Sequence, residues 1–157
     1  MSNTNLNDIL NRAPTEIERP KPLPQGNYVT VIVGMPRYDK SSKRQTDLVE
    51  FQHKFASYDE EVDAEALAEA LTNKTTGEIK SLSDVVMKNT FYITEGAAWR
   101  LKLFLKDCGF NVESDEMSMR EMIEQTTGRS VGVVIKHSPT QDGQGVFAQI
   151  GGTFAVE

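Results

Sequence analysis

Strands with one apolar and one polar face are the main feature that this chain predicts. In residues 46–59, Val49, Phe51 and Phe55 share one parity, and the opposite parity is mostly polar. A strand with one buried and one wet face is typical of an antiparallel sheet. Four further runs, rich in β-branched or aromatic residues, predict strands at residues 26–35, 85–94, 130–137 and 146–156.

Turns and breaks separate these strands. Residues 37–45 are polar and predict a loop after the first strand. Pro36 either ends that strand or makes it an edge strand, because proline lacks the backbone donor that a central strand needs. Asp142 and Gly143 predict a hairpin between the last two strands, and glycines in the final strand permit a bend or a bulge.

Helical spacing of apolar residues occurs on both sides of the third strand. An acidic helix is predicted at residues 63–71, where Leu67 and Leu71 are four residues apart. After the third strand, Thr94 is a candidate N-cap for a longer helix that Gly109 ends. The apolar stripe of this helix consists of Ala97, Leu101, Phe104, Leu105 and Cys108.

A short helix and an N-terminal arm complete the prediction. Ser118 and Glu121 have the spacing of a capping box, so a short helix begins there and stops near Gly128. Residues 1–25 contain four prolines and predict a flexible arm, with a short helix around residues 6–12. The remaining residues, 26–157, contain no internal repeat and predict one domain.

The order of these elements predicts a mainly β fold. Five strands, with helix between the third and the fourth, match a five-stranded Greek-key barrel of the oligonucleotide-binding (OB) type with a helical insertion. Strand periodicity alone does not distinguish this barrel from another small β-barrel or from an α+β sandwich.

Composition narrows the class of protein. The chain has 157 residues and one cysteine, so it is long enough for a core and has no internal disulfide. No apolar run approaches the roughly 18 residues of a membrane helix, and no basic start precedes an apolar stretch as in a signal peptide. We therefore expect a cytoplasmic protein without a membrane partner.

Catalytic and metal-binding patterns are missing from the sequence. The two histidines, His53 and His137, have no cysteine or second histidine at ligand spacing, and the common nucleophile and phosphate-loop motifs are absent. Cys108 lies on an apolar stripe, where a cysteine is usually part of the core. We expect no enzymatic activity, no metal and no cofactor.

Basic and aromatic residues, by contrast, occur together in the loop after the first strand. Proteins that bind single-stranded nucleic acid combine cations for phosphates with aromatic faces for bases. This loop offers both, although an ordinary polar hairpin loop has a similar composition. The candidate binding residues in it are Arg37, Tyr38, Lys40, Lys43 and Arg44.

The outward parity of the strands adds further candidates. Lys54, Lys88, Tyr92 and Lys136 fall on that parity and would form a basic face if their strands adjoin, although Glu50 shares it. Trp99 either covers an end of the barrel or, if exposed, stacks a base. The phenylalanines expected in the core are Phe51, Phe55, Phe91, Phe104 and Phe147.

Three segments carry a resemblance to a known family. Pro24 to Tyr28 leads into the first strand, Leu101 to Leu105 is followed by Gly109, and Gly128 to Val133 opens the fourth strand, with Arg129 where the family has lysine. In these motifs the chain resembles a phage single-stranded DNA-binding protein family. The resemblance implies an OB fold that coats single-stranded DNA during phage replication or recombination, in the host cytoplasm.

The first hypothesis is therefore a protein that binds single-stranded DNA without sequence specificity, with replication or recombination proteins as further partners. A phage structural protein or replisome adaptor that acts through protein–protein contacts is the alternative. A nuclease inhibitor that mimics DNA is a third option, suggested by the net charge of −6. Monomer and dimer both remain open.

Overall fold

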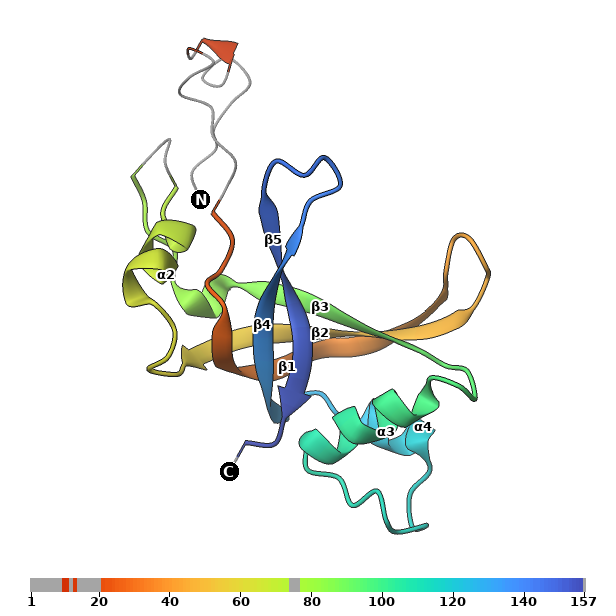
Figure 1. Ribbon diagram of the computed structural model, residues 1–157. Helices are drawn as coiled ribbons and strands as arrows, with labels where there is room; N and C mark the ends of the chain where they lie inside the picture. Colours follow the sequence, from red (N-terminus) through yellow and green to blue (C-terminus); the bar gives the residue numbers. More distant parts are fainter. Residues whose placement is uncertain (1–9, 12, 14–20, 74–76, 157) are drawn as a thin grey trace.

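Five antiparallel strands form one sheet in the order β3-β2-β1-β4-β5 (Figure 1). The computed structural model describes residues 10, 11, 13, 21–73 and 77–156. The strands are β1 (Gly26–Lys40), β2 (Asp47–Tyr58), β3 (Val86–Tyr92), β4 (Ser130–Pro139) and β5 (Val146–Phe154). The helices are α2 (Ala64–Leu71), α3 (Ala98–Asp107) and α4 (Met119–Glu124), with a short 3-10 helix, η2 (Leu82–Asp84).

The mainly β prediction, with helix between the third and fourth strands, is confirmed, but the sheet is not closed into a barrel. Strands β4 and β5 cross β1, β2 and β3 steeply in Figure 1, so the sheet is strongly bent. Among the described residues, β3 and β5 do not pair and remain its two edges. Helix α3 contacts both edge strands instead, and Thr153 of β5 donates a hydrogen bond to Asp107 at the end of α3 (2.7 Å).

Strand β1 is longer than predicted, and this corrects the loop at residues 37–45. Pro36 does not end the strand, because a register irregularity between Val33 and Arg37 accommodates the missing backbone donor. Beyond Val31, β1 pairs with β2 alone, so Pro36 lies in an edge segment. Arg37, Tyr38 and Lys40 are therefore strand residues, and the turn itself is residues 41–46.

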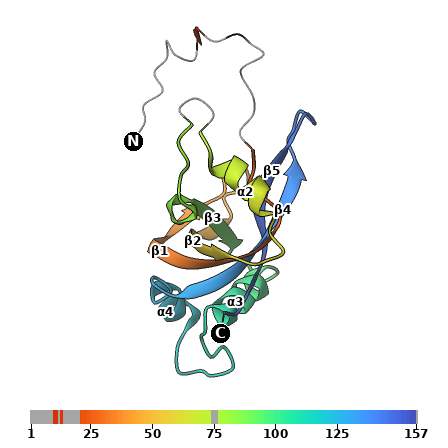
Figure 2. The same cartoon turned by 90° about the vertical axis from the view of Figure 1, so that its left-hand side faces the viewer.

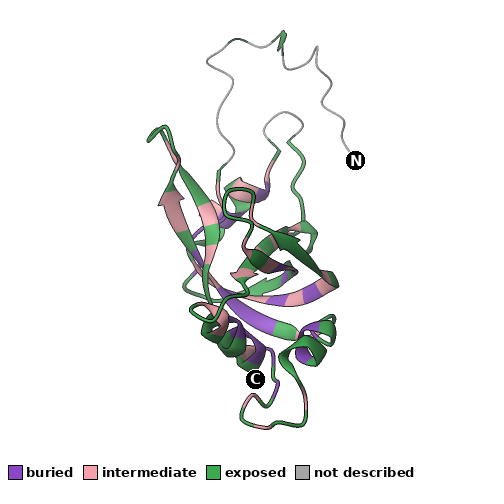
Figure 3. Ribbon diagram, turned by 90° about the vertical axis from the view of Figure 1, so that its right-hand side faces the viewer, coloured by how far each residue is buried: buried purple, intermediate pink, exposed green. Residues whose placement is uncertain are grey.

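The predicted parities are confirmed where the sheet covers the core. Val49, Phe51 and Phe55 of β2 are at most 1% exposed, and β4 buries its alternate residues in the same way. Buried residues form two clusters, one where the sheet meets α3 and α4 and one where it meets α2, whereas residues 136–150 of the β4–β5 hairpin are exposed or half-buried (Figure 3). Phe147, which we expected in the core, is 46% exposed because it lies on that hairpin, opposite Ser138.

Helix α3 turns its predicted stripe inward and leaves its tryptophan outside. Leu101, Phe104 and Leu105 are buried against the sheet. Trp99 lies off this stripe and is 54% exposed, so of its two predicted alternatives the structure agrees with the exposed side chain and not with a cover for an end of the barrel. The helix begins at Ala98, later than predicted, and the Thr94 hydroxyl accepts a hydrogen bond from the backbone amide of Ala97, the residue directly before the helix.

The other two helices begin where their capping residues predict, although α4 ends at Glu124, before the predicted stop near Gly128. Asp63 caps α2 by accepting hydrogen bonds from two backbone amides, and Ser118 and Glu121 form the predicted capping box of α4. Gly109 follows α3 with φ of +96°, a backbone conformation that favours glycine. Within the described part of the chain, no helix has the length and apolar character needed to span a membrane.

The end of the N-terminal arm is held against the sheet. Leu23 and Pro24 are buried, the Tyr28 hydroxyl donates to the Pro24 carbonyl (2.6 Å), and His137 Nε2 donates to the Leu23 carbonyl (2.7 Å). Figure 2 shows the described end of this segment entering the sheet near α2. Most of the predicted arm, including most of the helix expected at residues 6–12, lies outside the described residues.

Candidate nucleic-acid interface

The outward residues predicted on β2 and β3 lie on one surface. Gln52 pairs with Lys88, and Leu48 pairs with Tyr92, so side chains of the same outward parity stand side by side. Lys54, Lys88 and Tyr92 are all exposed. We call this surface, on the side of β1, β2 and β3 away from the core, the outer face.

Carboxylates neutralise part of the outer face. The Arg37 guanidinium lies 3.3 Å from an Asp39 oxygen and 3.6 Å from an oxygen of Glu50, and Lys88 Nζ lies 3.6 Å from the other Glu50 oxygen. Three of these four side chains are about half exposed or more, so their pairs are weak and can exchange for other partners. Glu50 therefore holds the side chains of Arg37 and Lys88 on the outer face, and both cations are partly neutralised there.

A hollow of about 550 Å³ adjoins the outer face where the β1–β2 turn approaches the end of β3. Two exposed cations, Lys43 and Arg44, lie on its turn side, and Tyr92, which is 49% exposed, lies on its β3 side. Among the described residues, neither cation forms an ion pair. The other lining residues are Ser41, Ser42, Thr46, Thr94 and Ala97.

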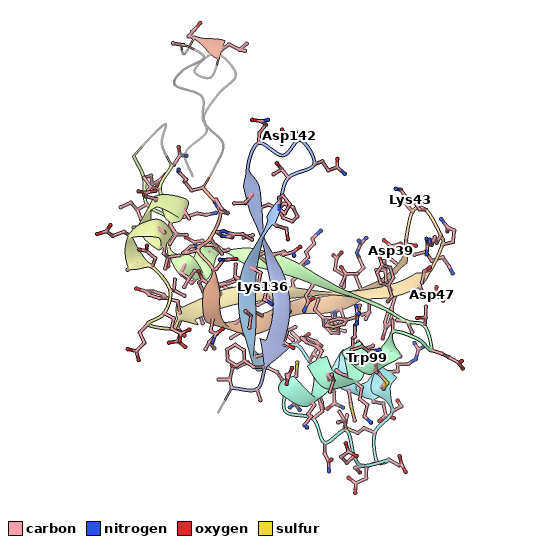
Figure 4. All side chains as sticks on the ribbon, in the orientation of Figure 1. Asp39, Lys43, Asp47, Trp99, Lys136 and Asp142 are labelled. Atoms are coloured by element: carbon pink, nitrogen blue, oxygen red, sulfur yellow. The ribbon has the colours of Figure 1, made fainter. Side chains whose placement is uncertain are left out.

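Lys40 has a different environment from its two basic neighbours. Its Nζ lies 2.8 Å from an Asp47 oxygen, across the base of the turn. Figure 4 shows Lys43 at the tip of the hairpin, beyond both Asp39 and Asp47. The turn therefore presents its unpaired positive charge at the tip, beside the hollow.

Tyr38 lies on the other side of the hairpin. It pairs with Val49, whose side chain is buried, and directly opposed residues of an antiparallel pair share a face. The guanidinium carbon of Arg120, from α4, lies 5.8 Å from the centre of the Tyr38 ring. The structure therefore does not bring Tyr38 together with Tyr92, although the two rings are similarly exposed, at 44% and 49%.

Lys136 is also separate from the hollow. It pairs with Gln149 of β5, and its aliphatic stem covers Gly151, where an added Cβ would lie 2.6 Å from the lysine Cδ. Figure 4 places Lys136 on the front of the β4–β5 pair, well away from Lys43 at the tip of the other hairpin.

The hollow has four lining residues with aliphatic hydroxyls that were not among the predicted site residues: Ser41, Ser42, Thr46 and Thr94. The order of the strands could have indicated that these residues lie close together. In consecutive antiparallel strands, the turn after the first strand and the end of the third strand lie at the same edge of the sheet. A residue directly after β3 is therefore expected near that turn.

Two buried titratable groups, His53 and Cys108, lie in the core. Burial lowers the pKa of His53 to about 4, so its ring is neutral at neutral pH. The Thr30 hydroxyl donates to the Val131 carbonyl (2.9 Å) and accepts from His53 Nδ1 (2.9 Å), which leaves Nε2 to face the Asn89 amide. Burial, with the neighbouring Asp107 charge, likewise raises the pKa of the Cys108 thiol to about 12.

Comparison with known proteins adds no further assignment. No protein-family model matches the chain, and no match is found among the curated proteins.

Proposed function

We propose that this protein binds single-stranded DNA without sequence specificity, through the hollow and the adjoining outer face. The observation that carries the proposal is the meeting of Lys43, Arg44 and Tyr92 around one hollow. Cations of a turn suit phosphates, and an exposed aromatic ring suits any base, since every base has a face that can stack. The volume of about 550 Å³ is in the range of sites that hold small ligands.

The strand order supports an OB-type fold as part of this proposal. An OB fold is a five-stranded, partly open barrel that binds oligonucleotides on the face of its second and third strands, between the loops after strands one and four. Here the order β3-β2-β1-β4-β5 corresponds to such a barrel opened between β3 and β5. The hollow lies beside the first of those loops and the end of β3.

The cellular role proposed with this activity rests on the resemblance to phage single-stranded DNA-binding proteins. Coating single strands during replication or recombination requires affinity for phosphate and base without readout of base edges. The residues of the hollow offer charge, hydroxyls and one ring, which fits such a requirement. The proposed location is the host cytoplasm, and the proposed further partners are replication or recombination proteins.

Two tyrosines of similar exposure provide the test. Stacking on an aromatic ring contributes about 1–3 kcal/mol per base, so Tyr92→Ala should weaken binding of a labelled oligothymidine by roughly tenfold or more. Tyr38→Ala removes an equally exposed ring from the opposite side of the hairpin and should leave the affinity unchanged. Fluorescence anisotropy measures both; equal losses, or a loss with Tyr38→Ala alone, would place the ligand elsewhere.

A second function is favoured by the ion pairs of the candidate cations. Arg37, Lys40 and Lys88 each face a carboxylate, as expected of a surface that is not built for phosphate. An adaptor or structural protein that acts through protein–protein contacts would have such a surface. Absence of binding to single strands at low salt would favour this function over the first.

A further inference from the structure

Two charged surfaces of opposite sign consist of residues that do not line the hollow. The first is the stretch 59–69, which we call the acidic segment. It contains six carboxylates and no lysine or arginine. Because the whole chain has a formal net charge of −6, the remaining residues sum to zero. The six acidic residues, all exposed, are Asp59, Glu60, Glu61, Asp63, Glu65 and Glu69.

The second surface is the exposed side of α3, which we call the α3 stripe. Trp99 and Leu103 are 54% and 49% exposed and lie four residues apart, so they are neighbours on the helix surface. The guanidinium carbon of Arg100 lies 5.3 Å from the centre of the tryptophan ring. Lys102 and Lys106 are exposed on the same helix. The stripe thus combines an apolar centre with three cations.

Both surfaces lack partners of opposite charge. Among the described residues, no ion pair joins a carboxylate of the acidic segment or a cation of the α3 stripe to any group. Figures 1 and 2 show α2 and α3 at opposite ends of the molecule, so the acidic segment and the stripe of one molecule lie far from each other. Neither surface can therefore neutralise the other within one copy.

The acidic surface also offers apolar area next to its charges. Tyr58 directly precedes the acidic segment and is 46% exposed, and Ala68 is exposed on α2. An aromatic and aliphatic pair such as Trp99 and Leu103 can pack against such groups while the flanking charges pair. Aromatic residues at the centre and charges at the rim are the usual arrangement of a protein interface.

We propose that the acidic segment of one copy binds the α3 stripe of the next, so that copies associate head to tail. An interface between two different surfaces is heterologous, and it produces open chains of molecules rather than a closed dimer unless the rotation closes a ring. Nucleic acid bound to the stripe would neutralise only the cations of the stripe, and it would leave the carboxylates of the acidic segment without a partner of opposite charge. A second copy of the chain neutralises the charges of both surfaces through one kind of contact.

The association should be detectable without DNA. Because exposed charges are screened at high ionic strength, the full-length chain should self-associate at about 0.05 M salt and disperse at about 0.5 M. Sedimentation velocity measures the size distribution. Trp99 is the only tryptophan in the chain, so its emission should shift to shorter wavelength as the concentration rises, which reports directly on the stripe.

Two variants with one altered surface each test the head-to-tail geometry. Lys102→Glu with Lys106→Glu makes the stripe repel acids, and Glu61→Gln, Glu65→Gln and Glu69→Gln together weaken the acidic segment. Each variant alone should remain monomeric at low salt. A mixture should form pairs that do not extend, since one variant keeps its acidic segment and the other keeps its stripe. Lys136→Glu, away from both surfaces, should associate like the parent.

Three results would overturn this proposal: a parent protein that is monomeric at low salt, a stripe variant that still associates, or a mixture that does not pair. A stripe variant that associates normally but loses affinity for single strands would make the stripe a nucleic-acid site instead. All substitutions are at exposed positions, and thermal unfolding verifies that each variant is folded. The tyrosine test of DNA binding uses variants outside both charged surfaces, so a loss of self-association and a loss of DNA binding are distinguished.

Discussion

At the scale of single residues, the buried network around His53 makes stability depend on pH. Unfolded histidine has a pKa of 6.5, whereas the folded ring has a pKa of about 4, so the unfolded chain binds a proton in this interval that the folded chain does not. The contribution of His53 is full above about pH 6.5 and declines as the pH falls toward about 4.

The prediction is that the free energy of unfolding falls by up to about 1.4 kcal/mol per pH unit between about pH 6 and pH 5 on account of this residue. Urea unfolding across that range measures the slope. His53→Gln, which keeps a polar side chain but does not titrate, should flatten the slope. An identical slope in the variant would mean that the ring is protonated in the folded protein.

Residue identity predicted which side chains are buried in β2 and α3, but it did not predict which aromatic side chains stay exposed. Cys108 and the alternate residues of β2 are in the core, as apolar stripes indicate. Phe147 and Trp99 are exposed, because a hairpin that projects from the sheet and the outer side of a helix have no layer to cover them. The hydrophobicity of a side chain shows that its burial would be favourable. Whether it is buried depends on whether another helix or strand packs against it.

At the scale of elements, α3 contributes three buried side chains, Leu101, Phe104 and Leu105, to the core. Leu101 is 1% exposed and packs in the cluster that joins α3 and α4 to the sheet. Leu101→Ala should lower the free energy of unfolding by roughly 2–5 kcal/mol, because it leaves a cavity.

The neighbouring Lys102 is the control for that substitution. It is exposed, so Lys102→Ala should change the free energy of unfolding by no more than about 0.5 kcal/mol. Urea unfolding of both variants measures the two changes in the free energy of unfolding. Similar losses would show that the buried side of α3 has been assigned to the wrong residues.

Strand boundaries were the part of the fold that sequence predicted least well. The β1–β2 hairpin extends to Lys40 through Pro36, since an edge segment with an irregular register does not need that backbone donor. As a consequence Arg37 and Tyr38, expected in one loop, lie on opposite sides of a strand pair. The hollow could not be predicted from the sequence of the β1–β2 turn or of β3 alone, because it forms where these two segments meet.

At the scale of the whole molecule, positive and negative charges are concentrated in different regions. Negative charge is concentrated in the acidic segment, and the unpaired cations of the β1–β2 turn lie at the tip of the hairpin that projects to the right in Figure 1. A net charge of −6 is therefore compatible with a local site for phosphate, since exposed charges are screened beyond about 10 Å at 0.1 M salt.

The most direct measurement of the central claim is the affinity for labelled oligothymidine as a function of salt. Phosphate contacts release counterions, so the logarithm of the association constant should fall linearly with the logarithm of the salt concentration, by about 0.7 per contact. Lys43→Ala with Arg44→Ala should reduce that slope by about one to two units. Lys136→Ala, far from the hollow, should keep the slope. Absence of binding at low salt, or an affinity that does not change with salt, would contradict the account.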